Sequence, residues 1–133
     1  MIFRCYSDIK EKICWTFHPC KNYGENITWE QWHTKIPLRI FGTDCDKLLQ
    51  EYVTGIYPLK DPTDNKIIEV FDPCFDNWIG KEDWNKIINK IKDKLQRNNN
   101  RPSKSENEFY NNFLEWIEKE LEWADIIVVD SNL

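Results

Sequence analysis

Residues 125–130, Asp-Ile-Ile-Val-Val-Asp, place four β-forming side chains in a row between two aspartates. An unbroken apolar run of this kind indicates a strand that is covered on both faces, because a strand with one face in water alternates apolar and polar residues. We therefore expect an inner strand near the end of the chain. The rest of the sequence must supply the layers that cover it.

A long helix is predicted directly before this strand, over about residues 106–123. Ser105 followed by Glu108 has the spacing of a capping box, which satisfies the first free N–H groups of a helix. The apolar residues recur at helical spacing and form one stripe: Phe109, Phe113, Trp116, Ile117 and Leu121.

A second helix is predicted over residues 81–97, where lysines lie opposite an apolar stripe of Trp84, Ile87, Ile88, Ile91 and Leu95. The nine polar residues 97–105 form an exposed connection of a length that suits two antiparallel neighbours. We therefore expect the two helices to pack together, with Ile88 and Ile91 facing Phe113 and Ile117.

Further elements are predicted in the first half of the chain. Period-2 alternation favours a strand over residues 12–18, although a helix beginning after Ser7 is an alternative. Residues 36–41 alternate in the same way, residues 43–54 have helical spacing ended by Gly55, and residues 66–71 resemble a mostly buried strand.

The length of 133 residues suits one globular domain spanning residues 1–133. The order of the predicted elements indicates an α+β (or α/β) fold, in which a small mixed sheet packs against about three helices.

Charge is unevenly distributed along the chain, whose formal net charge is −5. Residues 79–104 carry eight basic and three acidic side chains, while residues 105–133 carry one and eight. The acidic balance argues against nucleic acid as the main partner. No apolar run is long enough to cross a membrane and the N-terminus lacks a signal-peptide pattern, so we expect a cytoplasmic protein without a membrane partner.

Cysteine chemistry is the first enzymatic alternative. The five cysteines are an odd number in a chain without an export signal, so we expect reduced thiols. Cys14, His18 and Cys20 are the tightest cluster, but their spacing is not a familiar zinc pattern and no activated cysteine–histidine pair is recognisable. We expect no metal and no cofactor.

Carboxylate pairs are the second enzymatic alternative. Asp44 with Asp46, and Asp72 with Asp76, could act as acid and base or hold a divalent ion. The first pair falls in the first turn of a predicted helix, where negative charge stabilises the helix dipole without any catalytic role. The familiar catalytic motifs do not occur, and we expect a protein that is not an enzyme.

Residues 71–80, Phe-Asp-Pro-Cys-Phe-Asp-Asn-Trp-Ile-Gly, combine three aromatic residues with two acids in a predicted loop. Such a mixture is typical of interfaces, and the alternative is that Phe71, Phe75 and Trp78 fill the core as the chain turns. We predict partner contacts at Asp72, Asp76 and Trp78, with Glu25 and Trp29 as second choices.

A small, acidic, aromatic-rich chain without catalytic motifs resembles the immunity proteins that neutralise bacterial polymorphic or contact-dependent toxins. Two short stretches, Tyr23-Gly-Glu-Asn26 and residues 125–129, are similar to segments of the barstar family of ribonuclease inhibitors. The elements between these stretches do not match that family, so neither its fold nor its binding residues are carried over.

The resemblance implies a protein that binds a cognate toxin and occludes its active site. The expected toxin is cationic, as a nuclease is. Carboxylates would steer association and aromatic side chains would exclude water from the contact. The alternatives are a small enzyme that uses its carboxylates or cysteines, and a regulatory or scaffold protein with another partner.

Overall fold

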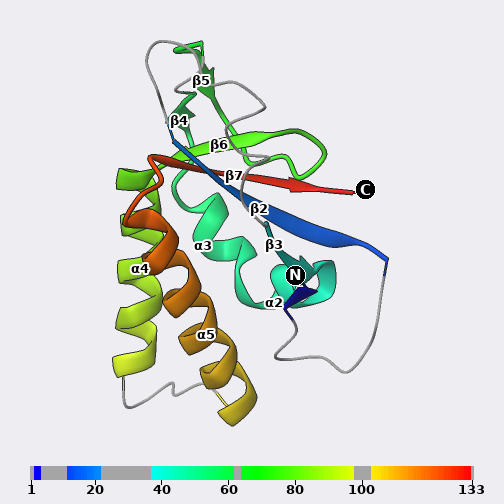
Figure 1. The fold of residues 1–133 in the computed structure, drawn as a ribbon, viewed down its shortest axis with the longest axis vertical. Coiled ribbons are helices and arrows are strands. Elements are labelled where there is room, and N and C mark those ends of the chain that lie inside the picture. The colour runs from blue at the N-terminus through cyan, green and yellow to red at the C-terminus, as the bar shows by residue number, and fades with distance from the viewer. Residues whose placement is uncertain (1, 4–11, 22–36, 62–63, 98–102, 133) are drawn as a thin grey trace.

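Strand β7 (Ile126–Ser131) lies inside the main sheet, between β2 (Cys14–Cys20) and β6 (Asn77–Gly80). Its first four residues are buried, which confirms the prediction of an inner strand covered on both faces. The computed structural model describes residues 2–3, 12–21, 37–61, 64–97 and 103–132, drawn in colour in Figure 1.

The main sheet has five strands in the order β1-β3-β2-β7-β6. β1 (Ile2–Phe3) runs parallel to β3 (Leu38–Phe41), and all other neighbours are antiparallel. The sheet is therefore mixed, as predicted. With its helices it forms a small α+β domain.

Strand β2 begins two residues later than predicted and passes through Pro19 to Cys20. Pro19 pairs with Ile127 of β7, and β3 pairs with β2 from Cys14 to Phe17 in the part of the chain that the structure describes. Most of the alternative helix after Ser7 falls outside the described residues, and Cys14–Cys20 is not helical.

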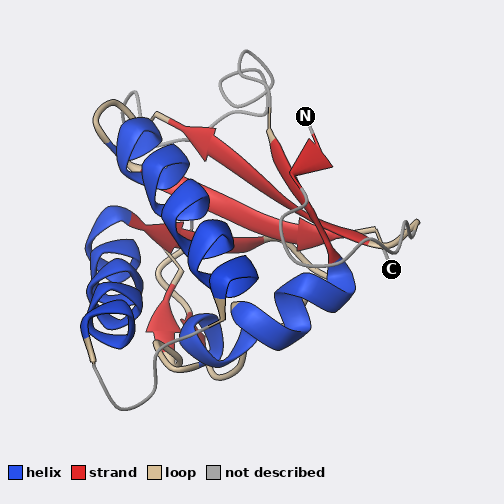
Figure 2. Cartoon of the chain, turned by 90° about the horizontal axis from the view of Figure 1, so that it is seen from below, coloured by secondary structure: helices blue, strands red, loops and turns tan. Residues whose placement is uncertain are grey.

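The described helices gather on one side of the main sheet (Figure 2). α4 (Lys81–Gln96) and α5 (Lys104–Leu121) lie side by side and antiparallel, as Figure 1 shows. This confirms the predicted pairing, and the four residues expected at its contact are buried in one core: Ile88, Ile91, Phe113 and Ile117. The Trp84 indole also donates a 3.1 Å hydrogen bond to the Ile127 carbonyl, which fixes α4 to β7.

Two helix boundaries differ from the prediction. The helix expected over residues 43–54 is divided at Leu49 into α2 (Gly42–Leu48) and α3 (Gln50–Thr54), and the Leu49 side chain is fully buried. α5 is capped by Ser103, whose Oγ accepts from the Glu106 N–H at 3.3 Å, and not by Ser105. Both serines have a glutamate three residues later, so spacing alone does not distinguish the two caps.

The prediction of a mostly buried strand over residues 66–71 is wrong. Only Ile67–Ile68 form a strand, β5, which pairs with β4 (Leu59–Lys60) in a separate two-stranded sheet. The Ile67 and Val70 side chains are 60% and 68% exposed. An apolar run predicts burial only where another element covers it, and this one extends beyond the main sheet, as Figure 1 shows.

Residues 71–80 also differ from the prediction of a loop, because Asn77–Gly80 form the edge strand β6. Trp78 therefore belongs to the main sheet, while Asp72 and Asp76 lie in the turn that leads into it.

Candidate functional site

The turn over residues 72–76 is wound around one buried side chain, Asn77, which is only 5% exposed. Its Nδ2 donates to the carbonyl oxygens of Asp72, Phe75 and Val129 at 2.7, 2.9 and 3.0 Å. Its Oδ1 accepts from the Asp72 N–H and the Tyr57 hydroxyl, both at 3.2 Å. One amide thus holds both ends of the turn and joins the turn to β7.

Backbone contacts reinforce the same turn. The Asp72 carboxylate accepts from the Cys74 N–H at 2.9 Å, an Asx turn, and the Phe75 N–H donates to the Asp72 carbonyl at 3.2 Å. The Ser131 N–H donates to the Pro73 carbonyl at 3.0 Å, which ties the turn to the end of β7. The turn is therefore held in one conformation before any partner arrives.

Sequence reasoning missed Asn77, although it recognised the segment around it. Asparagine is frequent in this chain, and nothing in the local pattern separates a buried asparagine from an exposed one. Its role depends on Tyr57 and Val129, which are far away in the sequence.

The turn forms one wall of a hollow of about 350 Å³ beside the edge of the main sheet. All three first-choice residues, Asp72, Asp76 and Trp78, line it. The remaining lining residues come from the β4–β5 hairpin, the segments flanking it, and the turn: Tyr57, Leu59, Asp61, Ile67, Ile68, Glu69, Val70, Phe75 and Asn77. The structure therefore brings the predicted residues together at one concave surface.

The hollow combines negative charge with exposed apolar area. Four carboxylates line it, and none of the described residues in its lining is basic. Ile67, Val70 and Phe75 are 60%, 68% and 71% exposed. Single exposed apolar side chains are ordinary, whereas several around one hollow are typical of an interaction site.

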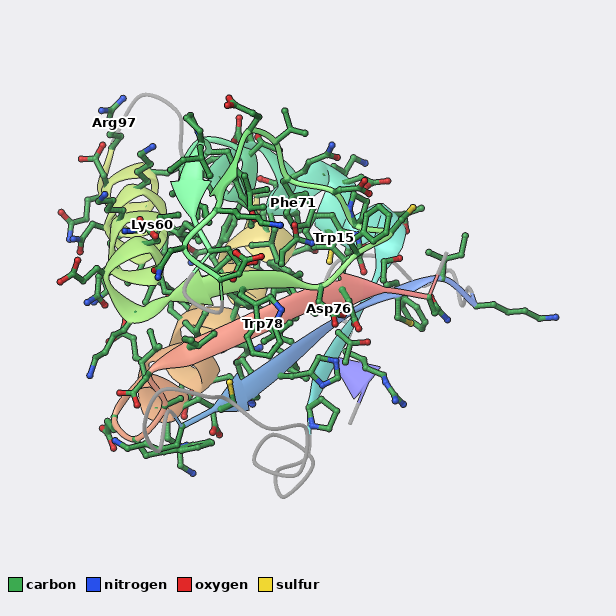
Figure 3. All side chains as sticks on the ribbon, turned by 90° about the horizontal axis from the view of Figure 1, so that it is seen from above. Trp15, Lys60, Phe71, Asp76, Trp78 and Arg97 are labelled. Atoms are coloured by element: carbon green, nitrogen blue, oxygen red, sulfur yellow. The ribbon has the colours of Figure 1, made fainter. Side chains whose placement is uncertain are left out.

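Trp78 is half-buried and contributes to two environments. It packs against a small apolar cluster of Cys20, Ile126 and Val128 on the sheet face away from the helices. Figure 3 shows Trp78 and Asp76 on one side of the sheet, and Trp15 and Phe71 on the other. The three aromatic residues of the segment thus have different surroundings. Phe71 packs on Trp15 with ring centroids 5.0 Å apart, and Phe75 is exposed.

Asp76 lies close to two other ionisable groups, Asp130 and His18. His18 Nε2 is 3.3 Å from Asp130 Oδ1. Burial of the carboxyl group, followed by the charge of Asp130 and a hydrogen bond between the two carboxyl groups, raises the pKa of Asp76, while His18 acts in the opposite direction.

The second-choice residues, Glu25 and Trp29, lie outside the described residues.

The cysteines offer little support for thiol chemistry in the described part of the chain. Cys14, Cys20 and Cys45 are buried, and Cys74 is exposed. Burial, with a smaller contribution from Asp125, raises the pKa of the Cys20 thiol to about 12, so this sulfur is a poor nucleophile at neutral pH. No three His, Cys, Asp or Glu side chains of the described residues are arranged to hold a metal ion.

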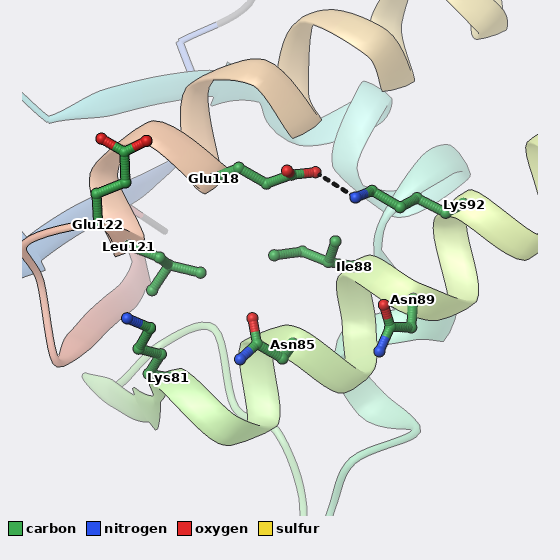
Figure 4. A pocket seen from close by; sticks show the side chains of 8 residues that line it. All are labelled: Lys81, Asn85, Ile88, Asn89, Lys92, Glu118, Leu121 and Glu122. Atoms are coloured by element: carbon green, nitrogen blue, oxygen red, sulfur yellow. Dashed lines mark ion pairs between the residues drawn. The ribbon is translucent and has the colours of Figure 1, made fainter.

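A second hollow, of about 400 Å³, lies between α4 and α5 and is shown in Figure 4. Its walls carry Lys81 and Lys92 from α4, Glu118 from α5, and Glu122 directly after α5. Lys92 Nζ is 2.9 Å from Glu118 Oε1. Because its charges are of both signs and partly paired, it does not select a ligand of one charge.

None of the described helices is long and apolar enough to span a bilayer.

Comparison with known proteins adds no functional assignment, because no family model, curated protein or solved structure matches this chain.

Proposed function

We propose that this protein binds a cationic protein partner and neutralises it, as an immunity protein neutralises its cognate toxin. The observation that carries the proposal is the hollow beside β6, which is lined by four carboxylates and three exposed apolar side chains and has a rigid turn as one wall. The residues predicted from sequence for partner contact, Asp72, Asp76 and Trp78, all line it.

Each component of the hollow has a physical role in such a complex. Carboxylates of one sign attract a basic surface over several ångströms and raise the association rate. Phe75 and Val70 supply apolar area that a partner can cover, and burial of that area slows dissociation. A lysine or arginine fits both features, because its aliphatic stem packs on apolar atoms while its charged end reaches a carboxylate.

The rigidity of the turn favours binding over a general surface role. The Asn77 amide and the Asx turn at Asp72 fix residues 72–76 in the free protein. Little conformational entropy is then lost when a partner binds, so more of the contact energy contributes to affinity.

The proposal is tested with the protein encoded by the adjacent gene, since immunity proteins are encoded beside their toxins. Expression of that protein alone should arrest growth, and co-expression of this chain should restore it. Association rates of the purified pair should fall steeply with added salt.

Three substitutions examine the surface directly. Asp72→Asn keeps an oxygen that accepts from the Cys74 N–H, so it removes charge while it preserves the turn. Asp61→Asn removes a charge that the segment directly after β4 contributes to the hollow, and Phe75→Ser removes apolar area. Glu115→Gln, on an exposed position of α5, is the matched control. The two aspartate variants should slow association, and Phe75→Ser should speed dissociation. An effect of Glu115→Gln as large as theirs, or no effect of any variant, would overturn the assignment.

A further inference from the structure

The register of β6 and β7 places two carboxylates next to one another. Asn77, the first residue of β6, pairs with Val129, and the next residue outward on each strand is an aspartate, Asp76 on one and Asp130 on the other. The two carboxyl groups are joined by a hydrogen bond. Like charges directly opposite in an antiparallel pair destabilise a sheet. This arrangement therefore has a free-energy cost in the isolated protein whenever both groups are ionised.

A histidine from the next strand completes the group. Asp130 pairs with Thr16 of β2, and His18 lies two residues along that strand on the same face. The His18–Asp130 contact of 3.3 Å joins β2 to β7 on the side of the sheet that carries Asp76. The side chains of Asp130 and His18 are 31% and 16% exposed, so solvent screens their charges only in part.

We propose that Asp76, Asp130 and His18 form a proton-linked switch that sets the charge of the partner-binding hollow. The inference rests on the proposed function, because Asp76 is at once a member of this group and a lining residue of the hollow. Asp130 and His18 act as positioning residues: they determine when Asp76 carries its negative charge.

The direction of the switch follows from the electrostatics. Burial and Asp130 both favour the protonated form of Asp76, and they raise its pKa against the opposing effect of His18. A cation brought by a partner favours the ionised form. Binding is therefore expected to release a proton, and acidification is expected to weaken binding by a slope approaching about one decade of affinity per pH unit below the pKa of free Asp76.

The other charged groups near Asp76 are few in the part of the chain that the structure describes. Asp72 lies in the same turn, and both carboxylates line the hollow together with Asp61 and Glu69. From the sheet, Arg39 of β3 pairs with Thr16, so that Arg39, Thr16 and Asp130 are cross-strand neighbours on the face of Asp76. Arg39 is thus separated from Asp130 by one strand, while His18 contacts Asp130 directly.

The test is a pH titration of the aspartate side-chain carboxyl carbons by NMR in the free protein. Asp76 should titrate at higher pH than an aspartate in a short unstructured peptide, which serves as the reference. In Asp130→Asn the Asp76 midpoint should move down toward that of the peptide, and in His18→Gln it should move up. Equal midpoints for Asp76 and the peptide aspartate, or an Asp76 midpoint unchanged in Asp130→Asn, would overturn the switch. Backbone amide spectra of each variant verify that the fold is retained.

Coupling to binding is measured separately with a nona-arginine peptide as the cationic probe. Calorimetry in two buffers of different ionisation enthalpy should show proton release on binding, and the release should be lost in Asp76→Asn. Binding without any proton release would overturn the coupling. Absence of binding at every pH would count against the proposed function, while the NMR titration would still decide on the switch.

Discussion

Replacement of Asn77 by alanine examines the turn on which the candidate site depends. The substitution removes three hydrogen bonds donated to the Asp72, Phe75 and Val129 carbonyls and two accepted from the Asp72 N–H and the Tyr57 hydroxyl. Nδ2 has only two hydrogens for these three acceptors, so at about 1 kcal/mol for each hydrogen the donated bonds account for a loss of about 2 kcal/mol. Equilibrium unfolding in urea measures this loss as a lower midpoint at unchanged slope.

The loss should be accompanied by local loosening of the turn. Hydrogen exchange at the Cys74 and Phe75 amides should accelerate in Asn77→Ala by more than the change in global stability explains. Asn77→Asp is the companion variant: it keeps an oxygen acceptor but removes both Nδ2 donors and aims negative charge at three carbonyls. It should be at least as destabilising as alanine. A loss below about 1 kcal/mol in both variants would refute the role assigned to Asn77.

Three further outcomes are expected. Because its pKa is raised, Asp76 contributes stability that is present below the pKa of the unfolded state and is lost as pH rises through the folded pKa. In thermal melts, Asp76→Asn should therefore gain stability relative to wild type as pH rises from acid to neutral. A difference in melting temperature that does not change with pH would contradict this. Trp78→Ala should lower the free energy of unfolding by about 1–3 kcal/mol, since the indole is half-buried on a small apolar cluster. Phe75→Ser should change it by less than about 0.5 kcal/mol, because Phe75 is exposed, and equal losses in the two variants would contradict this difference in burial. In peptide mapping after thiol labelling of the folded protein, Cys74 should react rapidly and Cys20 only on unfolding, and early labelling of Cys20 would disprove its burial.

Long periodic segments were predictable because their pattern reflects local geometry. The apolar stripes of residues 81–97 and 106–123 repeat at the spacing of a helix, and both helices are found with their stripes in the core. The apolar run before Asp130 could likewise be recognised as an inner strand, since only burial on both faces suits four such residues in succession.

Short apolar runs were less informative because burial depends on what covers them. Residues 66–71 have the composition of a buried strand, yet the structure places Ile67 and Val70 at the surface beside the hollow. The burial prediction for these residues was wrong, and their exposed side chains supply the apolar area of the candidate site.

The sequence by itself determined a fold of mixed α and β elements, the antiparallel helix pair, the inner strand, and the unusual mixture of acids and aromatic residues in residues 71–80. Each of these follows from neighbours within a few positions along the chain. The tertiary structure alone decided that Asn77 closes the turn, that Asp76 meets Asp130, and that the β4–β5 hairpin completes the hollow. These features join segments more than fifty residues apart or elements of separate sheets. Strand register decides which of their side chains meet, and no local sequence pattern encodes that register.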